Sequence, residues 1–142
     1  MNSRLNLSLR EKHGLVYSIG SSFTPFTDTG LFVITFGTEP KQLTKSIKLV
    51  KEELRKLCDE KMGIKQLASA KEQIMGQVAM AEESNISFMI MMAHNLLDLG
   101  RVTTLEEIFE RVRTTSSDRL VEIANEMFNE DKLSYLIMEP KS

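Results

Sequence analysis

Two short apolar runs stand out near the start of the chain, and their composition is typical of strands. Residues 15–19 and 31–36 are rich in β-branched and aromatic side chains. Pro25 and Asp28 lie between the runs and favour a turn, so we expect the two strands to pair antiparallel. The second run is apolar on both faces, which predicts a central strand.

Apolar residues at helical spacing precede and follow these strands in the sequence. At the start of the chain, Leu5 and Leu9 share one helical face, and Gly14 suits the left-handed residue that ends a helix. After the strands, Thr38 is a candidate N-cap with Pro40 in the first turn. The helix that follows has an apolar stripe, which comprises Leu43, Ile47, Val50, Leu54 and Leu57.

Four more helices and a final strand complete the predicted order. The helices cover residues 65–81, residues 85–99, a segment that starts at 104, and a segment from 116 or 117 to 127 or 128. The helix at 85–99 is apolar nearly all round, a pattern typical of buried helices. Residues 133–138 predict a closing strand. This order indicates an α+β fold, with helices packed on one face of a largely antiparallel sheet.

The length, charge, hydropathy and cysteine count of the chain exclude several classes of protein. The 142 residues predict a single domain. The net charge is -2 and the 18 basic residues are scattered, so we expect no nucleic-acid partner. No run of 18 apolar residues occurs, so we expect no membrane association. The single cysteine, Cys58, excludes an intrachain disulfide and a multi-cysteine zinc site.

The chain lacks the residues of a complete zinc site. His13 and His94 are its two histidines, and neither H-x-x-E-H nor H-E-x-x-H occurs. His94 and Asp98 are four residues apart and suit a structural pair on an apolar helix better than a metal-ligand pair. His13 follows a predicted helix end, where a cation or a side chain that bonds a carbonyl is favoured.

Two other features have a structural and a functional interpretation. Cys58 is a nucleophile candidate, but no histidine lies near it in the sequence. Methionines 89, 91 and 92 form either a core stripe or an adaptable binding groove, and the core interpretation is favoured. These residues alone indicate an α+β domain and do not identify an activity.

Two stretches carry a resemblance to a known family. Residues 1–5 read Met-Asn-Ser-Arg-Leu, and residues 9–18 read Leu-Arg-Glu-Lys-His-Gly-Leu-Val-Tyr-Ser. They closely resemble a motif of the pitrilysin/insulinase zinc peptidases, which include the mitochondrial processing peptidase. The resemblance continues at residues 28–32, around Leu54 and Gln73, and at residues 99–101. His13 stands where the family usually has arginine.

The resemblance implies a role in proteolysis. Such peptidases pair two similar α+β halves, and the first half binds zinc through H-x-x-E-H and a distal Glu. The second half lacks the metal and lends an arginine and a tyrosine, seven residues apart, to the shared cavity. Arg10 and Tyr17 stand at those positions. The chain would then be the C-terminal half, a fragment whose first strand and helix are missing, inactive without its zinc-bearing partner.

The chemistry of these two side chains suits that role. Peptide hydrolysis builds negative charge on the carbonyl oxygen, and a preorganised donor there contributes about 3 kcal/mol. Arg10 offers a permanent positive charge and Tyr17 a neutral hydroxyl donor. The alternatives are that Arg10 is a solvated charge at a helix end and that Tyr17, which alternates with Leu15 and Ile19, belongs to the core.

Several partners and alternatives follow from this interpretation. The expected partners are the zinc-bearing half, as the same chain or a separate subunit, and a peptide substrate. The missing strand would leave a sheet edge exposed, which predicts self-association. The alternatives are a non-catalytic scaffold or substrate-gripping subunit of the same fold, and an unrelated binding module. No export signal is seen, which favours the cytoplasm and leaves the periplasm open.

Overall fold

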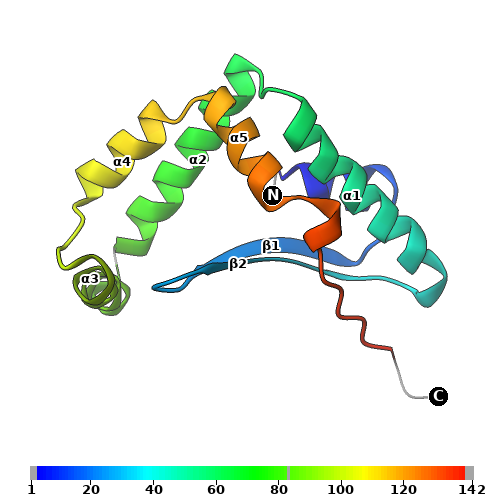
Figure 1. The fold of residues 1–142 in the computed structure, drawn as a ribbon, viewed down its shortest axis with the longest axis horizontal. Helices are drawn as coiled ribbons and strands as arrows, with labels where there is room; N and C mark the ends of the chain where they lie inside the picture. The colour runs from blue at the N-terminus through cyan, green and yellow to red at the C-terminus, as the bar shows by residue number, and fades with distance from the viewer. Residues whose placement is uncertain (1–2, 83, 140–142) are drawn as a thin grey trace. The chain divides into compact units, whose positions relative to one another are not determined.

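The computed structural model describes residues 3–82 and 84–139 (Figure 1). The chain divides into two compact units. The first unit comprises the residues up to 60 and those from 121 onward, and the second unit comprises residues 61–120.

The sheet of the first unit is a single hairpin. Strands β1 (Ser18–Pro25) and β2 (Gly30–Gly37) pair antiparallel, from Ser18 opposite Gly37 to Pro25 opposite Gly30. The turn closes where the Phe26 N–H donates to the Thr29 carbonyl at 2.8 Å. The predicted antiparallel pair and its turn are therefore confirmed.

Three strand predictions are wrong. The first strand begins at Ser18, because Leu15 and Val16 are buried in the core ahead of it. Within residues 3–82 and 84–139, β2 pairs with β1 alone, so it is not a central strand. Residues 133–138 form no strand in the described part of the chain, because no neighbouring strand pairs with them.

The core of the first unit lies between the hairpin and two helices. These are η1 (Asn6–Lys12), a π-helix, and α1 (Leu43–Asp59), and both lie over one face of β1 and β2 in Figure 1. Buried apolar side chains from both helices and from the segment between η1 and β1 form one cluster: Leu9, Leu15, Val16, Val50 and Leu54. Ile19, Ile34 and Phe36 of the hairpin pack against it. The fold is α+β, as predicted.

A buried carboxylate ties η1 to α1. Glu53 is 8% exposed, and its Oε1 accepts hydrogen bonds from the Ser8 hydroxyl at 3.0 Å and the Lys56 ammonium at 2.8 Å. Burial is the largest single influence on its pKa and raises it, but the bonds from Lys56 and Ser8 and the nearby positive charges together lower the pKa below its usual value. Glu53 therefore stays ionised and holds η1 against α1.

The second unit contains α2 (Ile64–Glu82), α3 (Asn85–Leu99) and α4 (Leu105–Thr114). α3 begins at Ser84, whose hydroxyl accepts from the Ser87 N–H, and ends at Gly100 with φ +67°, as predicted. Its predicted burial is wrong: no residue of α3 in the described part of the chain is buried, and Leu97 is 82% exposed. Apolar composition indicates burial only when a neighbouring element covers the helix.

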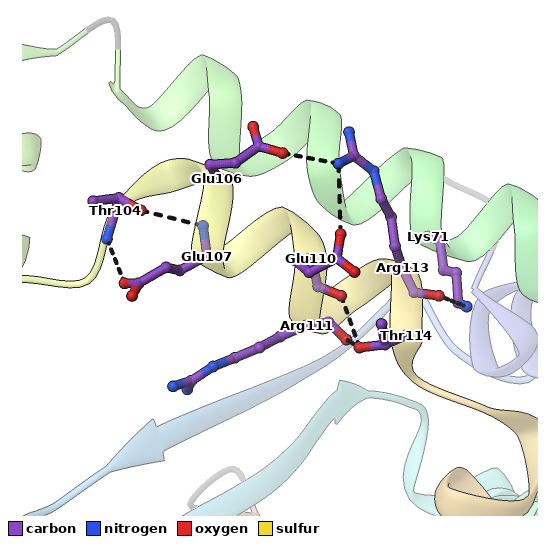
Figure 2. A network of polar contacts seen from close by, with 8 residues as sticks. All are labelled: Lys71, Thr104, Glu106, Glu107, Glu110, Arg111, Arg113 and Thr114. Atoms are coloured by element: carbon purple, nitrogen blue, oxygen red, sulfur yellow. Dashed lines mark hydrogen bonds and ion pairs between the residues drawn. The ribbon is translucent and has the colours of Figure 1, made fainter.

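Polar contacts hold the second unit together. Thr104 caps α4 in a capping box with Glu107, the start predicted from the sequence. Figure 2 shows the Arg113 guanidinium beside Glu106, at 3.0 Å, and beside Glu110 of the same helix. Lys71 of α2 donates to the Arg113 carbonyl at 2.6 Å, which joins α2 to α4.

The remaining elements complete the chain. The fifth predicted helix is confirmed as α5 (Ser117–Met127), whose first turn is capped by the Ser116 hydroxyl. Two 3-10 turns, η2 (Pro40–Gln42) and η3 (Glu130–Lys132), precede α1 and follow α5. A search of the described helices for one with the length and apolarity of a membrane span found none.

Candidate functional site

The segment between η1 and β1 carries both predicted site residues. η1 ends at Lys12 with His13 as its C-cap, and Gly14 has φ +58°, a left-handed conformation that glycine adopts without strain. This turn lets the Gly14 N–H donate to the Arg10 carbonyl at 3.0 Å and the Leu15 N–H donate to the Leu9 carbonyl at 2.9 Å. The predicted helix end at Gly14 is confirmed, although the helix is a π-helix.

Arg10 lies in the last turn of η1 and its side chain is exposed. Its neighbour Leu9 is completely buried, so the backbone that carries Arg10 is anchored in the core. Among residues 3–82 and 84–139, no hydrogen-bond or ion-pair partner is found for its guanidinium. The five N–H donors of the guanidinium face solvent from a fixed backbone.

Tyr17 lies directly before β1 and is 67% exposed, so the alternative that places it in the core is wrong. Its N–H donates to the Gly37 carbonyl at 2.8 Å. The Thr38 hydroxyl donates to the Leu15 carbonyl at 2.6 Å. Thr38 therefore joins the two segments and is not the predicted N-cap; Glu39 occupies the cap position of η2. These bonds fix the backbone on which the Tyr17 ring stands.

The Tyr17 hydroxyl donates to Glu39 Oε1 at 3.1 Å. This hydrogen bond, followed by burial and the negative charge of Glu39, raises the pKa of Tyr17 above its usual value of 10.0. Tyr17 is consequently a neutral donor at pH 7. Sequence reasoning missed Glu39. The hairpin register carries the signal once it is known, because extending the pairing of Ser18 with Gly37 by one residue places Tyr17 opposite Thr38, the residue before Glu39.

Arg10 and Tyr17 are two exposed residues of one short segment of the first unit. They stand on either side of the Gly14 turn, and the buried residues Leu15 and Val16 anchor the chain between them. No hydrogen bond joins their side chains among the described residues. A permanent cation and a neutral hydroxyl can each donate to an acceptor oxygen, and neither is a base or a nucleophile at neutral pH.

The histidines do not form a metal site. His13 Nδ1 lies 2.8 Å from the Ser8 carbonyl, as predicted for a side chain that bonds a carbonyl at a helix end. His94 is exposed on α3 of the second unit. Across the described ranges, no group of three or more His, Cys, Asp or Glu side chains is placed to hold a metal ion. The described residues therefore do not fit a zinc ion.

Cys58 has the properties of a structural cysteine. Burial, and to a smaller extent the charge of Asp59, raises the pKa of its thiol above the usual value of 9.0. A raised pKa lowers the fraction of thiolate, which is the nucleophilic form. The Cys58 carbonyl accepts from the Asn125 amide at 3.0 Å, so this position connects α1 to α5.

Fold and site together define a class of protein: an α+β domain that presents an arginine and a tyrosine on a helix-to-strand turn. The sequence profile of the Peptidase M16 inactive domain matches residues 1–74, more than half of the chain. The chain belongs to this family, and the predicted relation to the pitrilysin/insulinase peptidases is confirmed.

Similar proteins agree with this assignment. The chain is 34% identical to the uncharacterized zinc protease YmxG of Bacillus subtilis, over 96% of this chain and 34% of that protein. It is 31% identical to an uncharacterized zinc protease of Rickettsia felis, over 96% of this chain and 33% of that protein. The chain thus spans about a third of the length of these relatives.

A solved structure shows the same fold. The periplasmic protease PqqL from Escherichia coli superposes with a TM-score of 0.62 at 12% identity, over 85% of this chain and 14% of that chain. At this identity the likeness concerns the fold alone. The compartment of this chain stays a prediction.

Proposed function

We propose that this chain is the zinc-free, C-terminal half of a two-domain zinc endopeptidase, and that Arg10 and Tyr17 bind the carbonyl oxygen of the peptide bond that is hydrolysed. The observation that carries the proposal is the pair itself. Both side chains are exposed donors on a backbone anchored by Leu9, Leu15 and Val16. A role in the core would leave both side chains buried, and Tyr17 is 67% exposed.

The chemistry follows from the charge that develops during hydrolysis. When water attacks the peptide carbonyl, its oxygen becomes an oxyanion and needs donors that are already in place. Arg10 supplies a positive charge with five N–H donors, and Tyr17, whose pKa is raised, supplies a hydroxyl that stays protonated. Neither residue activates water, so the chain alone is expected to be inactive.

The proposal implies specific partners. The zinc ion and the residues that activate water would belong to the N-terminal half, as a preceding part of the same protein or as another subunit. Residues 1–142 would then act as one domain whose role is to bind the peptide substrate. The hairpin edges, which are unpaired among residues 3–82 and 84–139, also support self-association of the chain when this partner is absent.

The test replaces each donor in the chain assembled with its zinc-bearing half. Arg10→Ala and Tyr17→Phe should each lower kcat by roughly 100-fold to 1,000-fold, because each removes one donor to the oxyanion. Matched controls are Arg55→Ala and Tyr135→Phe, which change an exposed arginine and the other tyrosine of the first unit. Cleavage of a fluorogenic peptide measures the rates. Unchanged turnover in both site variants, with folding intact, would refute the oxyanion role.

The family description favours one alternative, a non-catalytic subunit that grips the substrate, since the matching profile is that of an inactive domain. The same variants separate the two functions. In the alternative, Arg10→Ala weakens peptide binding while kcat at saturating peptide is unchanged. In the proposed function, kcat falls even at saturation.

A further inference from the structure

The contact between Tyr17 and Glu39 has a consequence for peptide binding. A phenol hydroxyl carries one proton and can donate it to one acceptor at a time. In this structure the proton is directed at Glu39 Oε1, 3.1 Å away. A Tyr17–Glu39 bond and a bond from Tyr17 to a peptide carbonyl therefore exclude each other.

We propose that Glu39 competes with the peptide for the Tyr17 hydroxyl, so that a substrate carbonyl displaces the Glu39 carboxylate before Tyr17 contacts it. This inference rests on the proposed function, because it concerns the same donor. It adds a residue outside the arginine–tyrosine pair, and it assigns that residue a role that opposes binding in the free domain.

The backbone on both sides holds the competitor in place. Tyr17 N–H bonds to the Gly37 carbonyl, and the Thr38 hydroxyl bonds to the Leu15 carbonyl, so the two segments run together up to Glu39. Glu39 then starts the 3-10 turn η2, whose first residue is Pro40. The fixed φ of proline restricts the backbone directly after Glu39. Glu39 therefore reaches the hydroxyl as a consequence of the hairpin register.

Displacement is feasible because the pair is exposed. Tyr17 is 67% exposed and Glu39 is exposed as well, so water can hydrate the carboxylate once the hydroxyl leaves it. Exposed charged contacts contribute only about 0.2–1 kcal/mol. Glu39 should therefore weaken peptide binding by a small factor, between roughly 1.5-fold and fivefold.

The contact itself can be measured on the chain alone. The chain has two tyrosines and no tryptophan, so in a Tyr135→Phe background the phenolate absorbance reports Tyr17 only. Glu39→Ala should shift the ionisation midpoint of Tyr17 to lower pH, because the acceptor and its charge are gone. Glu52→Gln, which removes an exposed carboxylate of α1, is the matched control and should leave the midpoint unchanged. An unchanged midpoint in Glu39→Ala would show that the contact is absent in solution and overturn the proposal.

Competition is then tested by peptide affinity in the chain assembled with its zinc-bearing half, using a non-cleavable peptide analogue. Glu39→Ala should tighten binding by 1.5-fold to fivefold, and the gain should vanish when Tyr17 is already phenylalanine. Weaker or unchanged binding would overturn competition. The readout also separates the two proposals: if Tyr17→Phe leaves turnover unchanged, the oxyanion role fails, whereas the midpoint shift still reports the Glu39 contact.

Discussion

The two units of this chain are stabilised in different ways. The first unit has an apolar cluster that includes the fully buried Leu9. In the described part of the second unit, Thr103 is the only buried residue. The capping box and the Arg113–Glu106 ion pair stabilise α4 itself, and the bond from Lys71 to the Arg113 carbonyl connects α2 to α4. Side chains that must hold a fixed position benefit from the first arrangement. Arg10 and Tyr17 both belong to the unit with the core.

The largest expected difference between the units comes from truncating a leucine. Leu9→Ala should lower the free energy of unfolding of the first unit by about 2–5 kcal/mol, because it leaves a cavity in the core. Leu97→Ala in the second unit removes an equal volume from a side chain that is 82% exposed, and should change stability by less than about 0.5 kcal/mol. Native-state hydrogen exchange measures the free energy of opening of each unit. Equal effects would show that the second unit has a core of its own.

A glycine substitution should act with opposite sign in the two units. Gly14→Ala should destabilise the first unit by about 1–2 kcal/mol, because an L-residue at φ +58° is strained by its own backbone, although no atom beyond its chain neighbours lies within 4 Å of the new Cβ. Gly76→Ala should stabilise the second unit by about 0.5–1 kcal/mol, because Gly76 is inside α2 and its Cβ also meets open space. Urea titration followed by circular dichroism measures both, and stabilisation by Gly14→Ala would contradict the left-handed turn.

The smallest expected effect is that of acid on the start of α4. The Thr104 backbone N–H, and then Arg101, lower the pKa of Glu107 below its ordinary 4.5. A lowered pKa in the folded state contributes stability above pH 4.5, and this contribution is lost as pH falls through the folded pKa. The Thr104 amide signal in NMR should therefore change below about pH 4.5. Glu107→Gln should remove that change, and persistence of the change would assign it to another group.

Features that depend on local chemistry were predictable from the sequence. The capping box at Thr104, the glycine ends at Gly14 and Gly100, and the apolar stripe of α1 all follow from residues a few positions apart. The exposed position of Arg10 also follows from its place one residue after the inward-facing Leu9. In each case the deciding contacts lie within one element or its cap.

Features that depend on distant partners were not predictable. A strand at residues 133–138 needs a neighbour, and the burial of α3 needs a covering surface, neither of which sequence periodicity supplies. Thr38 has the right residue type for an N-cap, but its hydroxyl bonds to Leu15, 23 residues away. Glu39 was overlooked because its contact with Tyr17 appears only once the hairpin register is known.

The two-stranded sheet also links the stability of this chain to the concentration of any strand that pairs with its edges. An isolated hairpin of two strands is marginal in water, so β1 and β2 depend on their packing against the helical core. Their outer edges offer unpaired N–H and carbonyl groups within the described part of the chain. Any strand that pairs there binds the folded chain and not the unfolded one. By mass action the melting temperature then rises with the amount of that strand present. A strand supplied by the proposed zinc-bearing half would therefore stabilise the folded state of this chain.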